Sequence, residues 1–201
     1  QHLMTNGQTG LVAQMLDMVP TGRLSKSKAE TLTDARRNHI GYHLGGMTSH
    51  PYHSAELEGS WYLARNNVSN QDIEIKYGGI RNLMFGESCM LTKHPLIRDA
   101  KGIEPMPHPH ISMGLNCADF TGLIHHYKFN NNPFERDKLE LQNVLRSSKV
   151  SDEIRLRLAA YDNEPDLDFG IEGLRTSPTI DELVSEDFLV LDDASRKALN
   201  I

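Results

Sequence analysis

The chain has 201 residues, of which 38% are apolar and 24% charged, and such a length and composition are typical of a globular domain with its own core. Its 27 acidic and 21 basic residues give a formal net charge of −6, which argues against nucleic acid as the main partner because phosphate binding favours a basic surface. Two cysteines are too few for a disulfide framework, no apolar run approaches the ~20 residues of a membrane span, and nothing resembles a signal peptide, so we expect a cytoplasmic protein.

The first part of the chain contains short apolar segments that predict β-strands. Residues 11–18 form the earliest of them, and Pro20 follows its end. Residues 21–38 carry basic and hydroxyl side chains and are expected to be solvated. Further short strands are expected at residues 80–85, 89–92 and 111–113.

The clearest strand covers residues 121–129, where the side chains alternate between two faces. One face is mostly apolar and is expected to pack on the core; it carries Thr121, Leu123, His125, Tyr127 and Phe129. His126 and Lys128 then project together on the opposite face.

The period changes to a helical one after residue 132. Pro133 suits the first turn of a helix that carries Phe134, Leu141 and Leu145. A second helix is expected to begin at Ser151 and to bury a stripe of Ile154, Leu158 and Tyr161. The capping-box pattern of residues 179–182 predicts the start of a third helix. We therefore expect an α/β part in residues 1–132 and a helical tail in residues 133–201.

Several polar clusters suggest chemistry but are interpreted as structural. His39, His43, His50 and His53 lie in a glycine-rich segment without cysteine or acidic ligands at a matching spacing, which favours a polar loop over a metal site. The pair His108 and His110 is compatible with either a chelate or a proline-stiffened turn.

Two further groups are also expected to be structural. Asp166-Leu167-Asp168 is a D-x-D sequence, but it follows Asn163-Glu164-Pro165 and is interpreted as a solvated acidic loop. Cys89 and Cys117 have no motif around them and are expected to be small core residues.

Four segments, in order along the chain, carry a resemblance. Residues 118–129 are similar to the pattern ADxTGxLLHxKF, residues 16–18 to LLDM, residues 78–85 to GGxRxxxF, and residues 91–98 to LSKxPLVRW, with Asp99 where Trp is usual. Together they resemble bacterial family 2 glycosyltransferases of the branch related to the family 92 enzymes. The similarity covers about residues 9–190 and is strongest from 78 to 139.

The resemblance implies a GT-A fold, a Rossmann-like mixed sheet, and transfer of a sugar from a nucleotide-sugar donor to a glycan or small-molecule acceptor, for cell-surface or exported polysaccharide. The half of that fold that binds the nucleotide and supplies the D-x-D site for Mg²⁺ or Mn²⁺ has no counterpart ahead of Leu11, and the chain opens on Gln1 without an initiator Met. We therefore expect the C-terminal, acceptor-side half of a glycosyltransferase domain, inactive in isolation.

The resemblance also implies roles for individual residues. His126 matches the histidine that serves such enzymes as an additional metal ligand, and Lys128 on the same face is suited to neutralise the departing diphosphate. Arg81 and Lys93 are expected to line the phosphate or acceptor side. Transfer with inversion needs a carboxylate to deprotonate the acceptor hydroxyl, and Asp119 is the nearest candidate.

Two alternatives stay open at this point. The first is a metal-dependent hydrolase lined by His108, His110, His125 and His126. The second is a non-catalytic remnant that serves as a binding or structural module.

Overall fold

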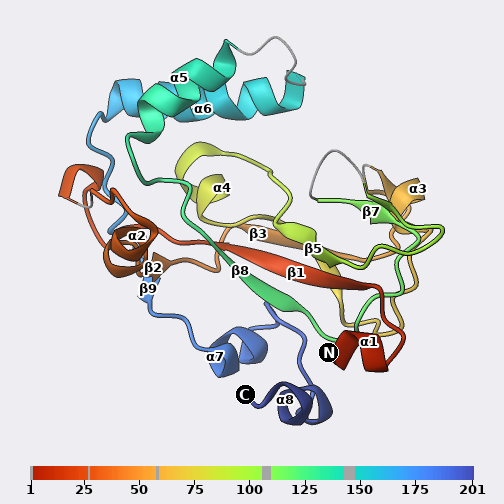
Figure 1. The fold of residues 1–201 in the computed structure, drawn as a ribbon. Coiled ribbons are helices and arrows are strands. Elements are labelled where there is room, and N and C mark those ends of the chain that lie inside the picture. Colours follow the sequence, from red (N-terminus) through yellow and green to blue (C-terminus); the bar gives the residue numbers. More distant parts are fainter. Residues whose placement is uncertain (1, 27, 58, 106–109, 143–147) are drawn as a thin grey trace.

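The computed structural model describes residues 2–26, 28–57, 59–105, 110–142 and 148–201. At its centre lies a three-stranded sheet in the order β5–β1–β8 (Figure 1). The middle strand, β1 (Gly10–Asp17), is buried along its whole length, which explains its apolar sequence and confirms the predicted strand. It runs antiparallel to β5 (Thr92–Ile97) and parallel to β8 (Gly122–His126), so the fold is α/β with a mixed sheet.

The parallel pairing of β1 with β8 has a fixed register. Ala13 pairs with Gly122, and Asp17 at the end of β1 pairs with His126 at the end of β8. Because the carboxyl ends of parallel strands meet at one edge of a sheet, these two polar side chains become neighbours although 109 positions separate them in sequence. Within the described residues, no strand pairs along the other edge of β8.

The remaining strands form small antiparallel pairs around this sheet. β3 (Met47–Pro51) pairs with β4 (Glu74–Gly78), and the segment of residues 89–92 connects β4 to β1 through bonds from Leu91 N to Lys76 O and from Met15 N to Leu91 O. The strand expected over residues 89–92 is therefore a bridging segment, and regular pairing begins at its last residue. The other pairs are β2 (Gly41–Tyr42) with β9 (Arg175–Thr176), and β6 (Glu104–Pro105) with β7 (Ser112–Met113).

The strand predicted over residues 80–85 is wrong, because this segment forms the helix α4 (Ile80–Phe85). Gly78 and Gly79 adopt positive φ angles of 88° and 70°, which turn the chain out of β4 and into the helix, and Gly86 ends it with a φ of 72°. The buried residues of α4, Ile80, Arg81 and Phe85, recur at helical rather than alternating spacing.

Residues 21–38 are less uniform than predicted. They are largely exposed, as expected, but they contain a short 3₁₀ helix, η1 (Leu24–Lys26), and the helix α2 (Leu32–Asn38). A capping box between Thr31 and Asp34 begins α2, and Ala35 anchors it in the core. Two other short helices are α1 (His2–Thr5), which precedes β1, and α3 (Ser60–Leu63), which lies between β3 and β4 in sequence.

The helical segments after residue 132 agree better with the sequence pattern. α5 (Pro133–Leu141) begins after Asn132, whose side chain accepts a bond from Glu135 N, while Leu145 lies outside the described residues. α6 (Ser148–Asn163) already includes the three residues before the predicted start at Ser151, and its inward stripe is the expected one. The last two helices are α7 (Ile180–Ser185), capped by Thr179, and α8 (Asp193–Leu199).

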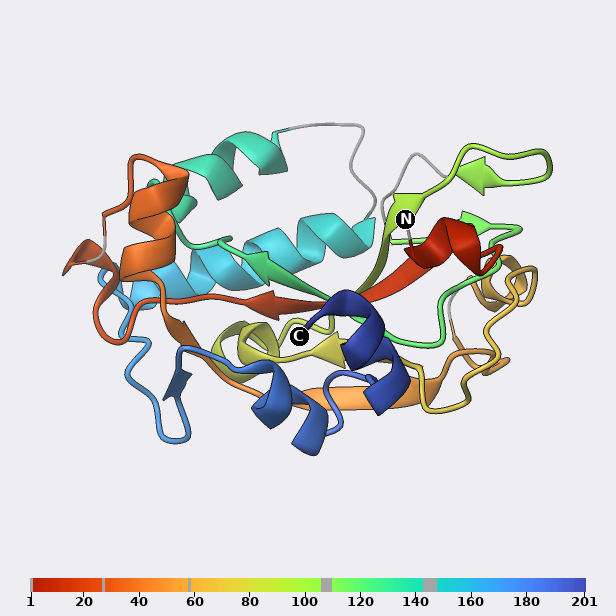
Figure 2. The ribbon, with the colours of Figure 1, turned by 60° about the horizontal axis from the view of Figure 1, so that its bottom comes forward.

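These helices lie on both sides of the central strands. Figures 1 and 2 show α5 and α6 on one side of β1 and β8, and α7 and α8 on the other. Tyr161 of α6 shares a core cluster with Phe85 and Phe129, whereas Leu183 of α7 packs with Leu16. Residues 133–201 thus complete the core around the sheet. Among the described residues, no helix has the length and apolar character needed to cross a membrane.

Candidate functional site

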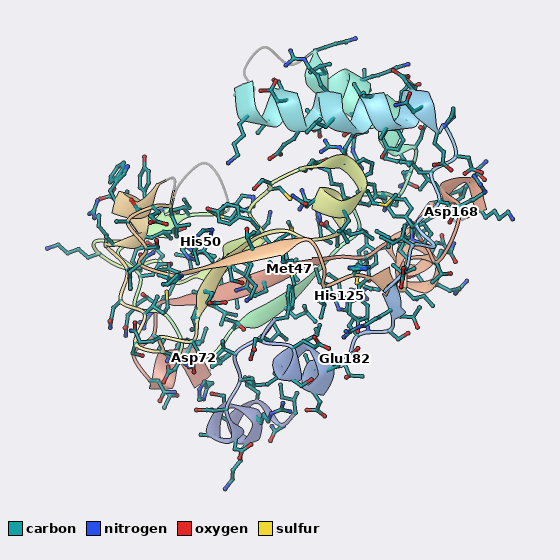
Figure 3. All side chains as sticks on the ribbon, turned by 180° about the vertical axis from the view of Figure 1, so that it is seen from behind. Met47, His50, Asp72, His125, Asp168 and Glu182 are labelled. Carbon is teal, nitrogen blue, oxygen red and sulfur yellow. The ribbon has the colours of Figure 1, made fainter. Side chains whose placement is uncertain are left out.

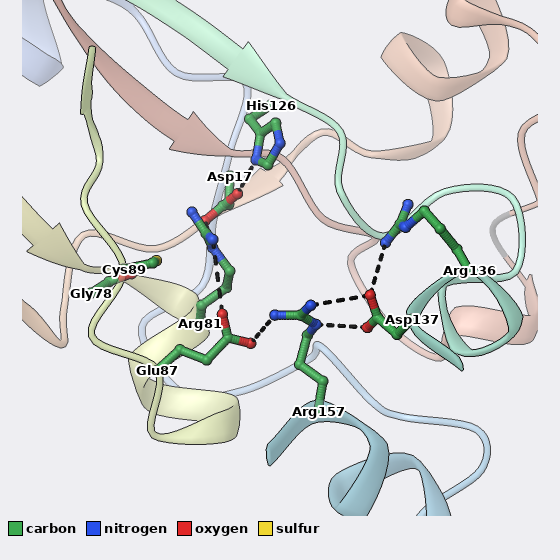
Figure 4. Close-up of polar contacts among 9 residues, drawn as sticks. All are labelled: Asp17, Gly78, Arg81, Glu87, Cys89, His126, Arg136, Asp137 and Arg157. Carbon is green, nitrogen blue, oxygen red and sulfur yellow. Dashed lines mark hydrogen bonds and ion pairs between the residues drawn. The ribbon is translucent and has the colours of Figure 1, made fainter. Parts of the chain in front are cut away.

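Three charged or titratable side chains meet where β1 and β8 end. The buried carboxylate of Asp17 accepts a hydrogen bond from His126 Nδ1 at 2.6 Å through Oδ1 and one from Arg81 Nε at 2.7 Å through Oδ2 (Figure 4). Asp17 comes from β1, His126 from β8 and Arg81 from the first turn of α4. The helix that replaces the predicted strand is therefore what delivers the guanidinium to the sheet.

The electrostatics of this triad fix its protonation. Burial alone would raise the pKa of Asp17, but the Arg81 guanidinium and His126 together lower that pKa to about 2. An ionised carboxylate only accepts hydrogen bonds, so Nδ1 of His126 carries the proton that the two share. Nε2 is then the ring nitrogen left for a ligand, and the side chain is 34% exposed.

A cleft of about 640 Å³ opens above this triad. Met15 and Cys89 form part of its floor beside Arg81, and the cleft extends from α3 at one end to α6 at the other. The cationic groups along it come from α4, β5, the end of β8 and α6: Arg81, Lys93, Lys128, Lys149 and Arg157. The acidic side chains in its lining, Glu140 and Glu153, come from α5 and α6.

The cations of the cleft crowd one another. Burial lowers the pKa of Lys93 and of Lys128, and the nearby Arg81 lowers both further. Arg81 itself keeps Nη2 buried without a hydrogen-bond partner among the described residues. An anion bound among these side chains would offset the repulsion between them.

A chain of buried ion pairs supports the cleft from below. Glu87 Oε1 accepts a bond from Arg157 Nη1 at 2.6 Å, while Glu87 Oε2 lies 3.8 Å from Arg81 Nη1. Arg157 also donates to both oxygens of Asp137, at 2.6 and 3.1 Å (Figure 4). These contacts join α4, α5 and α6 through side chains that are almost fully buried. Sequence reasoning missed Arg157, although it falls between Ile154 and the other members of the apolar stripe of α6.

Four of the five predicted site residues come together in this cleft: Arg81, Lys93, His126 and Lys128. Asp119 does not join them. It lies before β8, at the end of that strand opposite His126, where it is exposed and accepts a hydrogen bond from Gln8 Nε2. Its role as a catalytic base stays a prediction. Asp17, which orients His126, was not singled out as a site residue, because only the parallel pairing reveals it.

The face assignment of β8 is confirmed, but the expectation for His125 is wrong. His126 and Lys128 line the cleft, while Leu123, His125 and Tyr127 line a separate hollow on the opposite side. His125 is exposed there instead of packed in the core (Figure 3). The reason is local: α2 and the segment after β9 cover this end of the edge strand only in part.

Among the described residues, the other histidines do not form a group of three or more with metal-binding geometry. His43 accepts a bond from Gly45 N and donates to Glu172 O, so both ring nitrogens are engaged. His108 lies outside the described residues, and His110 Nδ1 lies 3.2 Å from Thr92 O at the cleft. Because His125 and His126 face opposite sides, the four histidines of the hydrolase alternative do not share a site.

The D-x-D sequence and the cysteines have structural surroundings. Asp166 accepts bonds from Ser25 N and Oγ, and Asp168 Oδ1 accepts one from Gly170 N, which ties the acidic loop to itself and to η1. Figure 3 shows Asp168 at the opposite side of the molecule from His50. Both cysteines are buried and free, and burial raises the pKa of each thiol to about 12.

His126 is a candidate ligand for a divalent metal in the cleft. A histidine whose Nδ1 is held by a carboxylate is the usual arrangement of a metal-binding imidazole, and His126 with Asp17 meets it. Within the described residues, no group of three or more His, Cys, Asp or Glu side chains is placed to hold a metal. The described residues therefore offer Mg²⁺ or Mn²⁺ fewer than three such ligands in one group, and His126 is the candidate among them.

Comparison of the chain with protein-family models, with curated proteins and with solved structures found no match.

Proposed function

We propose that this chain is the acceptor-side part of a glycosyltransferase domain of the GT-A type, and that its cleft holds the diphosphate of a nucleotide sugar during transfer. One observation carries the proposal. Each of the four segments that resemble family 2 glycosyltransferases contributes a residue to the triad or to the cleft lining: Asp17, Arg81, Lys93, and His126 with Lys128. Segments spread over more than 100 positions of sequence thus converge on one cleft.

The cations of the cleft suit the charge that develops in such a reaction. When an acceptor hydroxyl attacks the anomeric carbon, it gives its proton to a carboxylate base, the bond from that carbon to the diphosphate oxygen breaks, and negative charge accumulates on the leaving group. Lys93 and Lys128, which line the cleft beside Arg81, would stabilise this charge. Donors that are fixed before the reaction stabilise a transition state without the cost of reorientation.

The triad keeps its members in place for this task. Asp17 holds Nδ1 of His126 and Nε of Arg81 at the same time, so neither side chain is free to rotate away from the cleft. When a divalent metal is bound, it supplies further positive charge beside the diphosphate, and His126 is the residue of this chain that would hold it. The other ligands would come from the diphosphate and from the donor-binding part of the domain.

The donor-binding elements are proposed to belong to another segment of polypeptide. The free edge of β8 among the described residues is compatible with a larger sheet that continues there. The described cleft offers cations and hydrogen-bond donors, which recognise a diphosphate whatever nucleoside it carries. We therefore expect the chain to bind diphosphates without discriminating between bases, and to turn over no nucleotide sugar.

Calorimetric titration with inorganic pyrophosphate, uridine diphosphate and guanosine diphosphate, each with Mn²⁺, tests the proposal. Similar affinities for the three, together with no release of sugar from a panel of nucleotide sugars, are the expected result. Absence of pyrophosphate binding would overturn the anion site. Strong preference for one base, or robust turnover, would contradict the proposal that the nucleotide-binding elements lie elsewhere.

A further inference from the structure

The end of the cleft nearest α3 carries an exposed aromatic pair. Trp61 is the only tryptophan of the chain, and its side chain is 59% exposed. Its ring stacks on that of Tyr62 with the centroids 3.5 Å apart and the planes inclined by 30°. Both residues line the cleft. A tryptophan that contributes little to the core, yet lies at the mouth of a cleft, is available to bind a ligand.

The backbone next to the aromatic pair is held by buried contacts. Leu63, in the same helix, is almost completely buried, and Asn66 just beyond it accepts a bond from Leu115 N. The Asn66 amide also donates to Tyr52 Oη and to Ser112 O, each at 2.9 Å. The backbone that follows Trp61 is therefore held by packing and by hydrogen bonds. An aromatic surface that is fixed in advance binds a ring at a low entropic cost.

We propose that Trp61 and Tyr62 form a stacking subsite for a pyranose ring, so that the acceptor of this chain is a saccharide whose sugar unit lies at the mouth of the cleft. That the bound sugar is the acceptor rests on the proposed function. An aromatic face is electron-rich and attracts the weakly positive C–H groups on one face of a sugar ring. Met90 and Ile111 extend the apolar surface beside the pair.

The position of the pair favours a sugar over a nucleobase. α3 packs against β7, beyond the β5 side of the sheet, whereas the free edge at which nucleotide-binding elements are proposed belongs to β8 (Figure 1). The cations of the cleft come from α4, β5, the end of β8 and α6, and none of them comes from α3. A cleft of about 640 Å³ is of the size that holds a sugar ring together with a diphosphate.

The single tryptophan makes the subsite directly observable, since all tryptophan emission of the chain comes from Trp61. The probes are neutral disaccharides of gluco, galacto and manno configuration, with uridine as the competing ring. A saturable change in emission with at least one disaccharide, at millimolar concentrations, and none with uridine is the expected result. No saturable change with any disaccharide, or a response to uridine alone, would overturn the proposal.

Variants separate stacking from other causes of a response. Measured by saturation-transfer NMR, Trp61→Ala is expected to weaken disaccharide binding about tenfold, whereas Trp61→Phe keeps most of it because a ring remains. Leu96→Ala removes another exposed apolar side chain, which lies outside the cleft lining, and serves as the matched control. An equal affinity of Trp61→Ala and the unaltered chain would contradict the subsite.

The outcome is separable from that of the proposed function. Trp61→Ala is expected to leave pyrophosphate binding unchanged, because the cations that hold the anion do not involve this ring. Disaccharide binding without any pyrophosphate binding would leave the stacking subsite standing and overturn the diphosphate site. Pyrophosphate binding without disaccharide binding would leave the diphosphate site standing and overturn the stacking subsite.

Discussion

A charged and a neutral network of buried polar side chains can be compared among the described residues, and they differ in how far their hydrogen-bonding groups are satisfied inside the protein. The charged network is centred on Glu87. In one direction Glu87 pairs with Arg157, which pairs with Asp137. In the other direction Glu87 lies near Arg81, which pairs with Asp17 and so reaches His126. This network ends at a half-exposed histidine in a cleft. The neutral network joins His94 of β5 to Tyr52, Asn66 and Ser112.

The two histidines show what this difference means. His94 accepts a bond from Ser112 N at Nδ1 and shares another with Tyr52 Oη at Nε2, so both of its nitrogens are satisfied inside the protein. Burial lowers the pKa of His94 to about 4. His126 has one nitrogen fixed by Asp17 and the other toward the cleft. A closed network stabilises the fold, whereas an open one keeps groups ready for a ligand.

The largest expected effect comes from breaking the charged network at Arg157. Arg157→Met leaves the carboxylates of Glu87 and Asp137 buried without their partner, which commonly costs about 3–5 kcal/mol of unfolding free energy. Urea denaturation measures it. Arg155→Met removes an exposed pair with Asp152 on the same helix and is expected to cost at most about 0.5 kcal/mol. Equal effects of the two variants would show that the buried network has no special role.

The neutral network is expected to appear in the pH dependence of stability. Because the pKa of His94 is about 4 in the folded chain and 6.5 in the unfolded one, its contribution is complete above about pH 6.5 and is lost as the pH falls to about 4. The loss amounts to roughly 3 kcal/mol. His94→Asn, which keeps an acceptor for Ser112 N, should be less stable at pH 7 and should lack this part of the slope. A variant with an unchanged slope would refute the assignment.

A smaller effect is expected at the open end of the charged network. His126→Asn keeps a donor for Asp17 and removes the nitrogen that faces the cleft, so it should fold normally. Mn²⁺ is expected to increase the affinity for pyrophosphate less in this variant than in the unaltered chain. The difference should be about tenfold, because one metal–ligand contact is lost. His125→Asn, on the opposite face of the same strand, is the control. If His125→Asn alone abolished the Mn²⁺ response, the face assignment of β8 would be inverted.

Local patterns in the sequence predicted much of the fold. Alternation along residues 121–129 placed His126 and Lys128 on one face, and the helical spacing of Ile154 and Tyr161 identified the inward stripe of α6. These predictions hold because side-chain periodicity is a property of the strand or helix itself.

The remaining parts depend on long-range pairing that no local pattern contains. Asp17 becomes a site residue only because β1 pairs with a strand that begins more than 100 residues later. α4 was missed because two successive glycines with positive φ turn the chain from β4 into a helix, and a six-residue helix carries little periodicity. The exposure of His125 depends on how far α2 reaches over an edge strand.

The central claim, that the open cleft is a diphosphate site, is tested most directly by one calorimetric comparison. Inorganic pyrophosphate is titrated into the unaltered chain, into a Lys93→Gln/Lys128→Gln double variant, and into Lys101→Gln, which removes an exposed lysine outside the cleft lining. The account predicts that the double variant binds about 100-fold more weakly, at roughly 1.4 kcal/mol for each lost charge-assisted contact, and that Lys101→Gln binds normally. Equal affinities for all three proteins would contradict it.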